Sequence, residues 1–146
     1  MAITSAICNS FKQEILEAEH NFTASTGNTF NLALYDSDAS LGASTTAYSS
    51  SEEITNTSGT AYSAKGKALT SVTPTLDSST AVCDFADVSW TSASFTARGC
   101  LIFNDSHSTD ASVCAIDFGG DKTATSGTFT IQFPAASATA AIIRIA

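Results

Sequence analysis

Short segments in which apolar and polar residues alternate follow one another from residue 28 to the end of the chain. In the segment 127–134, Phe129, Ile131 and Phe133 alternate with polar residues. Successive side chains of a β-strand point to opposite faces, so this alternation predicts strands with one buried side. Seven such segments, separated by turn-forming residues, predict a mainly β fold, an antiparallel β-sandwich or jelly roll of about seven strands. They cover residues 28–35, 67–78, 80–90, 94–105, 112–120, 127–134 and 140–146.

A glycine-rich stretch between two of these segments raises the question of phosphate binding. A phosphate-binding loop places its lysine directly after the second glycine and continues into a helix. Here Asp121 separates Gly120 from Lys122, and strand-like alternation resumes at Thr128. We therefore expect a β-hairpin turn between strands at 112–120 and 127–134, and no nucleotide site.

One α-helix is predicted, over residues 4–20. Ile3, Ile7, Phe11 and Ile15 recur every four positions there, and Ser5 is a suitable N-cap. This apolar stripe can pack on the chain's own sandwich or on a neighbouring protein. In the second case the four residues form an interface with Phe11 as its central anchor. The chain is thus expected to be a single domain, 1–146, with a helical segment at 1–22 and a long polar loop at 36–66.

The charge of the chain argues against polyanionic partners. The formal net charge is −8, and the six basic residues are scattered along the sequence. Nucleic acids and anionic membranes are bound by clustered Lys and Arg, so we expect neither partner. No apolar run reaches the length of a membrane span, and the first residues lack the pattern of a signal peptide, so we do not expect secretory export.

The four cysteines, Cys8, Cys83, Cys100 and Cys114, form no CxxC pair, and two histidines do not complete a zinc set. The last three lie in predicted strands among apolar neighbours, which favours buried, reduced thiols. A disulfide between two of these strands remains an alternative. The expected core consists of Phe30, Leu32, Leu34, Phe85, Trp90, Leu101, Phe103, Ile116, Phe129, Ile131 and Phe133.

No catalytic residue, metal ligand or cofactor is predicted. The sequence has no G-x-S-x-G motif, and neither His20 nor His107 lies in a context typical of a general base. Carboxylates occur in adjacent pairs rather than in the facing arrangement that glycoside hydrolysis needs. We therefore expect a protein that is not an enzyme.

Two aspartate pairs are weak calcium candidates, and whether either binds calcium stays open. Asp36 and Asp38 open a segment that begins like a calcium-binding loop, but Ala47 stands where that loop needs a bidentate glutamate. A surface turn explains the segment more simply. The second pair is Asp117 with Asp121.

Three regions of the sequence carry a resemblance to a known family. They are ITSAICNSFKQEILEAEHNF near the start, FNLALYDSDASLGASTTAYSSSEEI after it, and DFADVSWTSASFTARGCLIFND with DFGGDKTATSGTFTIQFP and AAIIRIA in the second half. Together they resemble small virion structural proteins encoded in the morphogenesis region of tailed bacteriophages, and the block from Asp84 to Pro134 is the most specific part. The resemblance implies a virion component assembled in the cytoplasm of a bacterial host, and it brings no catalytic residues.

Three functions follow as hypotheses. The first is a capsid decoration (cement) protein that binds the head as a homo-oligomer, a trimer by analogy with other cement proteins, with the major capsid protein or other virion proteins as partners. The second is a tail-tube, baseplate or fibre-attachment component. The third is a carbohydrate-binding β-sandwich, in which Trp90, Tyr48 and Tyr62 form an exposed aromatic platform.

Overall fold

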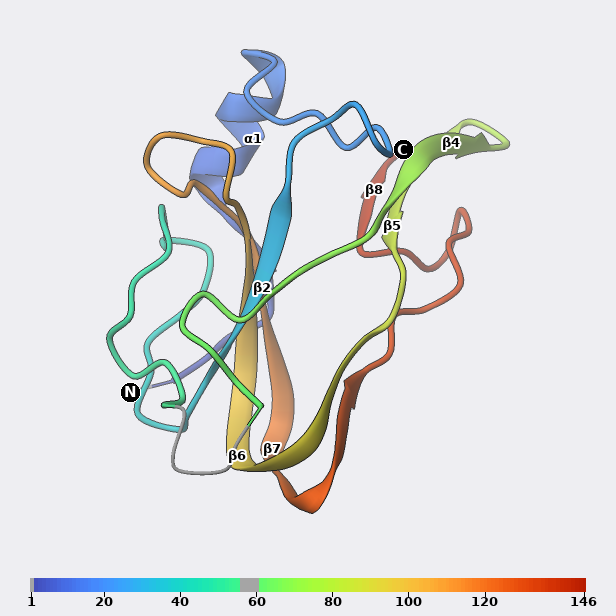
Figure 1. Ribbon diagram of the computed structural model, residues 1–146. Coiled ribbons are helices and arrows are strands. Elements are labelled where there is room, and N and C mark those ends of the chain that lie inside the picture. The colour runs from blue at the N-terminus through green and yellow to red at the C-terminus, as the bar shows by residue number, and fades with distance from the viewer. Residues whose placement is uncertain (1, 56–60) are drawn as a thin grey trace.

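The fold is mainly β, with two antiparallel sheets and one short helix (Figure 1). The computed structural model describes residues 2–55 and 61–146. The larger sheet has the strand order β1-β7-β6-β2-β3, and the smaller sheet has the order β4-β5-β8. The elements are β1 Ala6–Ile7, α1 Asn9–Leu16, β2 Phe30–Tyr35, β3 Lys67–Ala68, β4 Ser71–Asp77, β5 Thr80–Phe85, β6 Val88–Asn104, β7 Ser112–Ile131 and β8 Ile143–Ile145. The predicted β-sandwich with one amino-terminal helix is confirmed.

The two longest strands, β6 and β7, form one hairpin whose turn lies at 105–111. The hairpin predicted around the glycine-rich stretch is therefore wrong, because that stretch lies inside β7 and pairs with β6, for example Thr123 with Thr96. Gly119 has a φ of 75°, and the register shifts several times along the pair. Bulges of this kind take up extra residues without ending a strand. The partner strand is long enough to pair with the whole stretch, so the local turn signal is overridden.

Other strand boundaries also differ from the prediction. The predicted strand 80–90 is interrupted at residues 86–87, so that β5 ends at Phe85 and β6 begins at Val88. Strand β6 then continues through residues 91–93, where the prediction had placed a turn between two strands. The predicted strand 67–78 is divided into β3 and β4, which lie in different sheets. The predicted long connection 36–66 lies between the end of β2 at Tyr35 and the start of β3 at Lys67, and its residues 56–60 lie outside the described part of the chain.

The amino-terminal helix is shorter than the predicted span 4–20. Residues 6–7 pair with β7 as β1, and Ile3 bridges to Leu41, so α1 begins only at Asn9. Spacing of four residues also keeps side chains on one face of an extended strand, and the edge of β7 supplies hydrogen-bond partners that a first helical turn lacks. Ser5 does not cap the helix: its Oγ accepts the Asp117 N–H at 2.9 Å. No helix in the described residues is long and apolar enough to cross a membrane.

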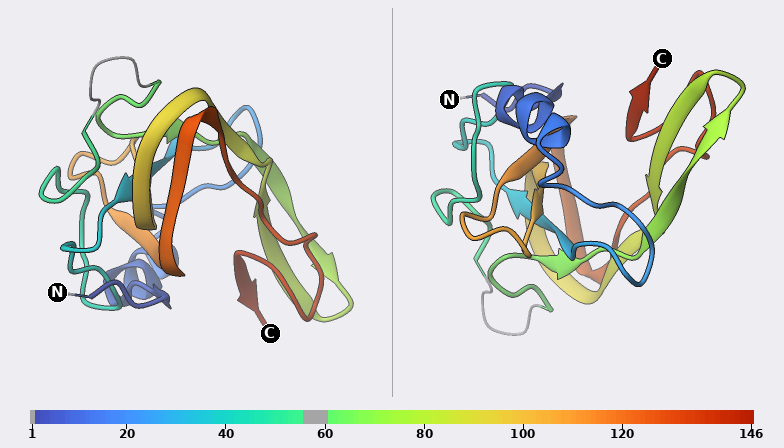
Figure 2. Two further views of the ribbon diagram at one scale, coloured as in Figure 1. Left: turned by 90° about the horizontal axis from the view of Figure 1, so that it is seen from below. Right: turned by 90° about the horizontal axis from the view of Figure 1, so that it is seen from above.

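The two sheets lie at an angle and resemble the arms of a V (Figure 2). They are joined where β5 leads into β6 and where the chain after β7 leads to β8. Phe22, Phe30, Phe85 and Phe133 form an aromatic cluster between them, with ring centroids 4.3 Å apart for Phe22 and Phe30 and 6.2 Å apart for Phe85 and Phe133. The sandwich is therefore closed near its joint and open further out.

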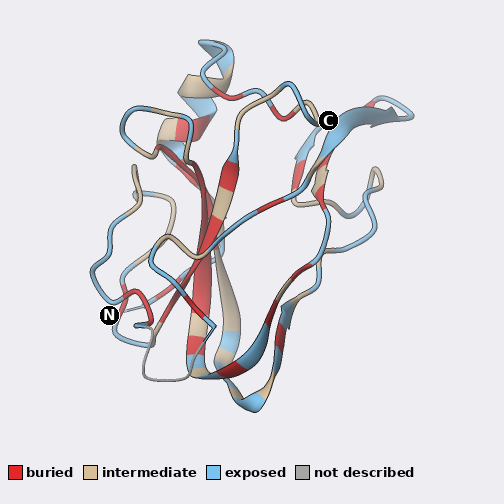
Figure 3. Ribbon diagram, viewed as in Figure 1, coloured by how far each residue is buried: buried red, intermediate tan, exposed pale blue. Residues whose placement is uncertain are grey.

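The core follows the central strands of the larger sheet (Figure 3). Eight of the eleven predicted core residues are buried, namely Phe30, Leu32, Leu34, Phe85, Trp90, Leu101, Phe103 and Phe129. The prediction is wrong for the other three, Ile116, Ile131 and Phe133, which are only partly buried. These three lie on β7 or just after it, on the side where the V is open.

Candidate functional site: two apolar hollows between the sheets

Two apolar hollows lie on the described part of the chain. The larger one, called the first hollow, has a volume of about 700 Å³ and lies between β7 and the segment that leads to β8. Its apolar lining includes Ile116, Phe118 and Ile131 from β7, with Phe133 and Ile142 from the chain beyond it. The partial exposure of these side chains shows that the hollow opens to solvent. A hollow of this size and lining is suited to an apolar group from another molecule.

The edge of β7 beside the first hollow is largely unpaired. Along its other side β7 pairs with β6 throughout, whereas β1 pairs with it only at Cys114 and Ala115. From residue 118 to residue 131 no described strand lies on that edge. An open edge exposes backbone donors and acceptors, so this part of β7 offers polar contacts next to an apolar surface.

The second hollow, of about 410 Å³, lies between α1 and the inner face of the smaller sheet. Phe11, Ile15 and Phe22 line one wall, and Ala81 and Ile145 line the other. Leu76 pairs with Ala81, which pairs with Ile145, so the three side chains share one face. Leu76 is 72% exposed and Ile145 59% exposed, which shows that the outer part of this face is uncovered.

The four candidate interface residues do not form one stripe. Ile3 and Phe11 are buried in the core, and the Phe11 ring lies 5.0 Å from the His20 ring, so Phe11 is not available as an anchor for another protein. Ile7 lines the first hollow and Ile15 lines the second. The stripe is divided because only part of it is helical.

Charge is distributed unevenly around the hollows. No carboxylate lines either hollow within the described residues, although the chain has 14 acidic residues. Lys122 is the single charged side chain at the first hollow, and it makes no ion pair with any described residue. The acidic groups therefore lie elsewhere, and the hollows present an apolar surface with one positive charge.

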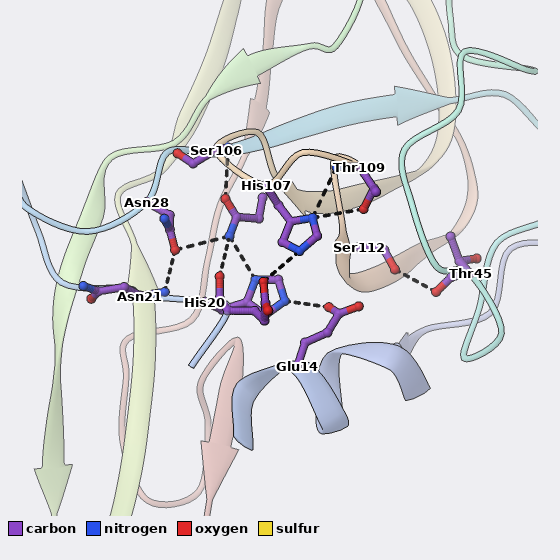
Figure 4. Close-up of polar contacts among 11 residues, drawn as sticks. Glu14, His20, Asn21, Asn28, Thr45, Ser106, His107, Thr109 and Ser112 are labelled. Atoms are coloured by element: carbon purple, nitrogen blue, oxygen red, sulfur yellow. Dashed lines mark hydrogen bonds and ion pairs between the residues drawn. The ribbon is translucent and has the colours of Figure 1, made fainter. Parts of the chain in front are cut away.

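The two histidines lie together, which the sequence did not indicate (Figure 4). Their ring centroids are 6.3 Å apart. Each histidine contacts a glutamate: His20 Nε2 lies 2.7 Å from Glu14 Oε2, and His107 Nε2 lies 3.0 Å from Glu19 Oε2. Asn104 Oδ1 accepts the Ser106 N–H, so its amide nitrogen must donate to His20 Nδ1 at 3.1 Å. His20 Nδ1 is therefore an acceptor, and Nε2 donates to Glu14.

This network connects the chain around α1 to the turn 105–111. Thr109 Oγ1 lies 3.0 Å from His107 Nδ1, which gives a hydroxyl, an imidazole and a carboxylate in series. However, the Thr109 N–H also donates to His107 Nδ1 at 3.2 Å, as in a local turn, and neither residue lines either hollow. The arrangement of Thr109, His107 and Glu19 therefore stabilises the turn and lies outside both hollows.

The predicted aromatic platform is wrong. Trp90 and Tyr62 are fully buried, with ring centroids 5.8 Å apart, and Tyr48 packs on Phe103. The hydroxyls of Tyr62 and Tyr48 donate to the two oxygens of buried Glu53 at 2.6 and 2.5 Å. Burial and the nearby carboxylate raise the pKa of Tyr48 to about 12 and that of Tyr62 further. These residues form an internal polar cluster and offer no sugar-stacking surface.

The structure gives the two calcium candidates different surroundings. Asp36 and Asp38 meet Glu52, with one carboxylate oxygen of each within 4.8 Å of the others. These three carboxylates would supply part of the six to eight oxygen ligands that Ca²⁺ takes, and calcium binding at this group stays a prediction. Asp121 instead accepts a hydrogen bond from Arg98 Nε at 2.8 Å, and Asp117 accepts one from the Gly119 N–H.

All four cysteines are free and buried. Burial raises the pKa of the thiols of Cys83 and Cys114 to about 12, and it raises the pKa values of Cys8 and Cys100 as well. A thiol that stays protonated is a poor nucleophile and a poor metal ligand. These side chains therefore act as small apolar groups in the core.

Comparison of the chain with family models, curated proteins and solved structures gives no match.

Proposed function

We propose that this chain is a virion structural protein of a tailed bacteriophage, of the capsid decoration type, and that it acts through contacts rather than catalysis. The observation that carries the proposal is the pair of open apolar hollows, the first of which lies beside an unpaired strand edge. Surfaces of this kind are typical of contacts with other proteins. The resemblance of the sequence to phage virion proteins supplies the class of assembly.

The remaining surface fits a position on the outside of a filled head. Because the net charge is −8, the chain would be repelled by packaged DNA, whereas it is tolerated on an outer protein shell. The partners in this role are the major capsid protein and further copies of the chain, arranged as a trimer by analogy with other cement proteins. The site of assembly is the bacterial cytoplasm.

The test is the copy number of the chain in purified virions, measured by quantitative mass spectrometry against the major capsid protein. A decoration protein is expected at hundreds of copies per particle. A few copies to some dozens would instead assign it to the tail or neck, which is the alternative role. Absence from purified virions would overturn both.

A direct binding assay adds a second readout. Purified protein is mixed with heads that lack it, and co-sedimentation is measured. Ile131→Asp, which places a charge in the first hollow, is compared with Leu16→Asp, which changes an 88% exposed side chain on α1. We expect the first variant to lose head binding or assembly and the second to retain both. Equal binding by the two would contradict a role for the hollow.

A further inference from the structure

We draw no further inference here: the strongest candidate, the first hollow beside the open edge of β7 between residues 118 and 131, is an unpartnered apolar surface, and nothing in the structure shows what covers it.

Discussion

The clearest test of the internal polar cluster compares Tyr62→Phe with Tyr48→Phe. Both changes remove one phenolic hydroxyl that donates to Glu53. The Tyr62 hydroxyl also accepts the Leu34 N–H at 2.9 Å, and both of its hydrogen bonds are buried. It thus occupies the place of a strand partner at the edge of β2. Tyr48 is only half-buried and makes one such bond.

The difference in stability can be worked out from these contacts. Tyr62→Phe loses a buried hydrogen bond to a carboxylate, about 1.5–3 kcal/mol, and leaves the Leu34 N–H unpaired, about 1–3 kcal/mol more. We expect a total loss of about 3–5 kcal/mol. Tyr48→Phe leaves a Glu53 oxygen that water can reach, so we expect about 1 kcal/mol. At roughly 2–4 °C per kcal/mol for a chain near 150 residues, Tyr62→Phe should lower Tm by roughly 10 °C.

Urea denaturation followed by Trp90 fluorescence is the assay, because Trp90 is buried against Tyr62. Both phenylalanine variants keep the aromatic packing, so their m-values should match the wild type. A loss in Tyr62→Phe no larger than that in Tyr48→Phe would refute the proposed cluster, since the two sites would then be energetically equivalent.

Three further predictions follow from burial. Phe11→Asp should give a destabilised or insoluble protein, because Phe11 is 3% exposed and a carboxylate at this position would be buried; soluble yield and thermal melting measure this. Cys83 and Cys114, with thiol pKa values near 12, should react with a disulfide reagent at pH 8 only after denaturation, and rapid reaction of the native protein would contradict their burial. The pKa of Tyr48 is raised from 10.0 to about 12, so its contribution to stability is complete below pH 10 and is lost as the pH rises to 12; urea melts across that range measure the decline.

The strand content was predictable because a period of two is a local property. Segments such as 28–35 and 140–146 show it directly, and β2 and β8 lie within them. The amino-terminal helix was only partly predictable, because Ile3 and Ile7 also fit an extended segment. Local sequence does not show that an open strand edge is available to pair with residues 6–7.

The hairpin within 112–134 was mispredicted for a related reason. Glycine, serine and threonine favour turns when no partner strand is present, yet β6 is 17 residues long and pairs opposite the stretch. The register between two strands is a long-range property, and so is the meeting of His20 with His107 or of Asp36 with Glu52. In each case the residues are visible in the sequence and their proximity is not.

Ile116, Ile131 and Phe133 show why a sequence pattern typical of a core does not by itself fix how far each residue is buried. Alternation indicates that one face of a strand avoids water, but it does not say whether the covering atoms belong to the same chain. Each unit of apolar area left exposed forgoes about 25 cal/mol per Å², so a face patterned for burial and left open is unfavourable in the isolated chain. Near β2, by contrast, Glu53 accepts hydrogen bonds from the hydroxyls of Tyr48 and Tyr62, so these buried polar groups find their partners within the chain. The open side therefore has the sequence pattern of a core, although its residues are only partly covered within the described chain.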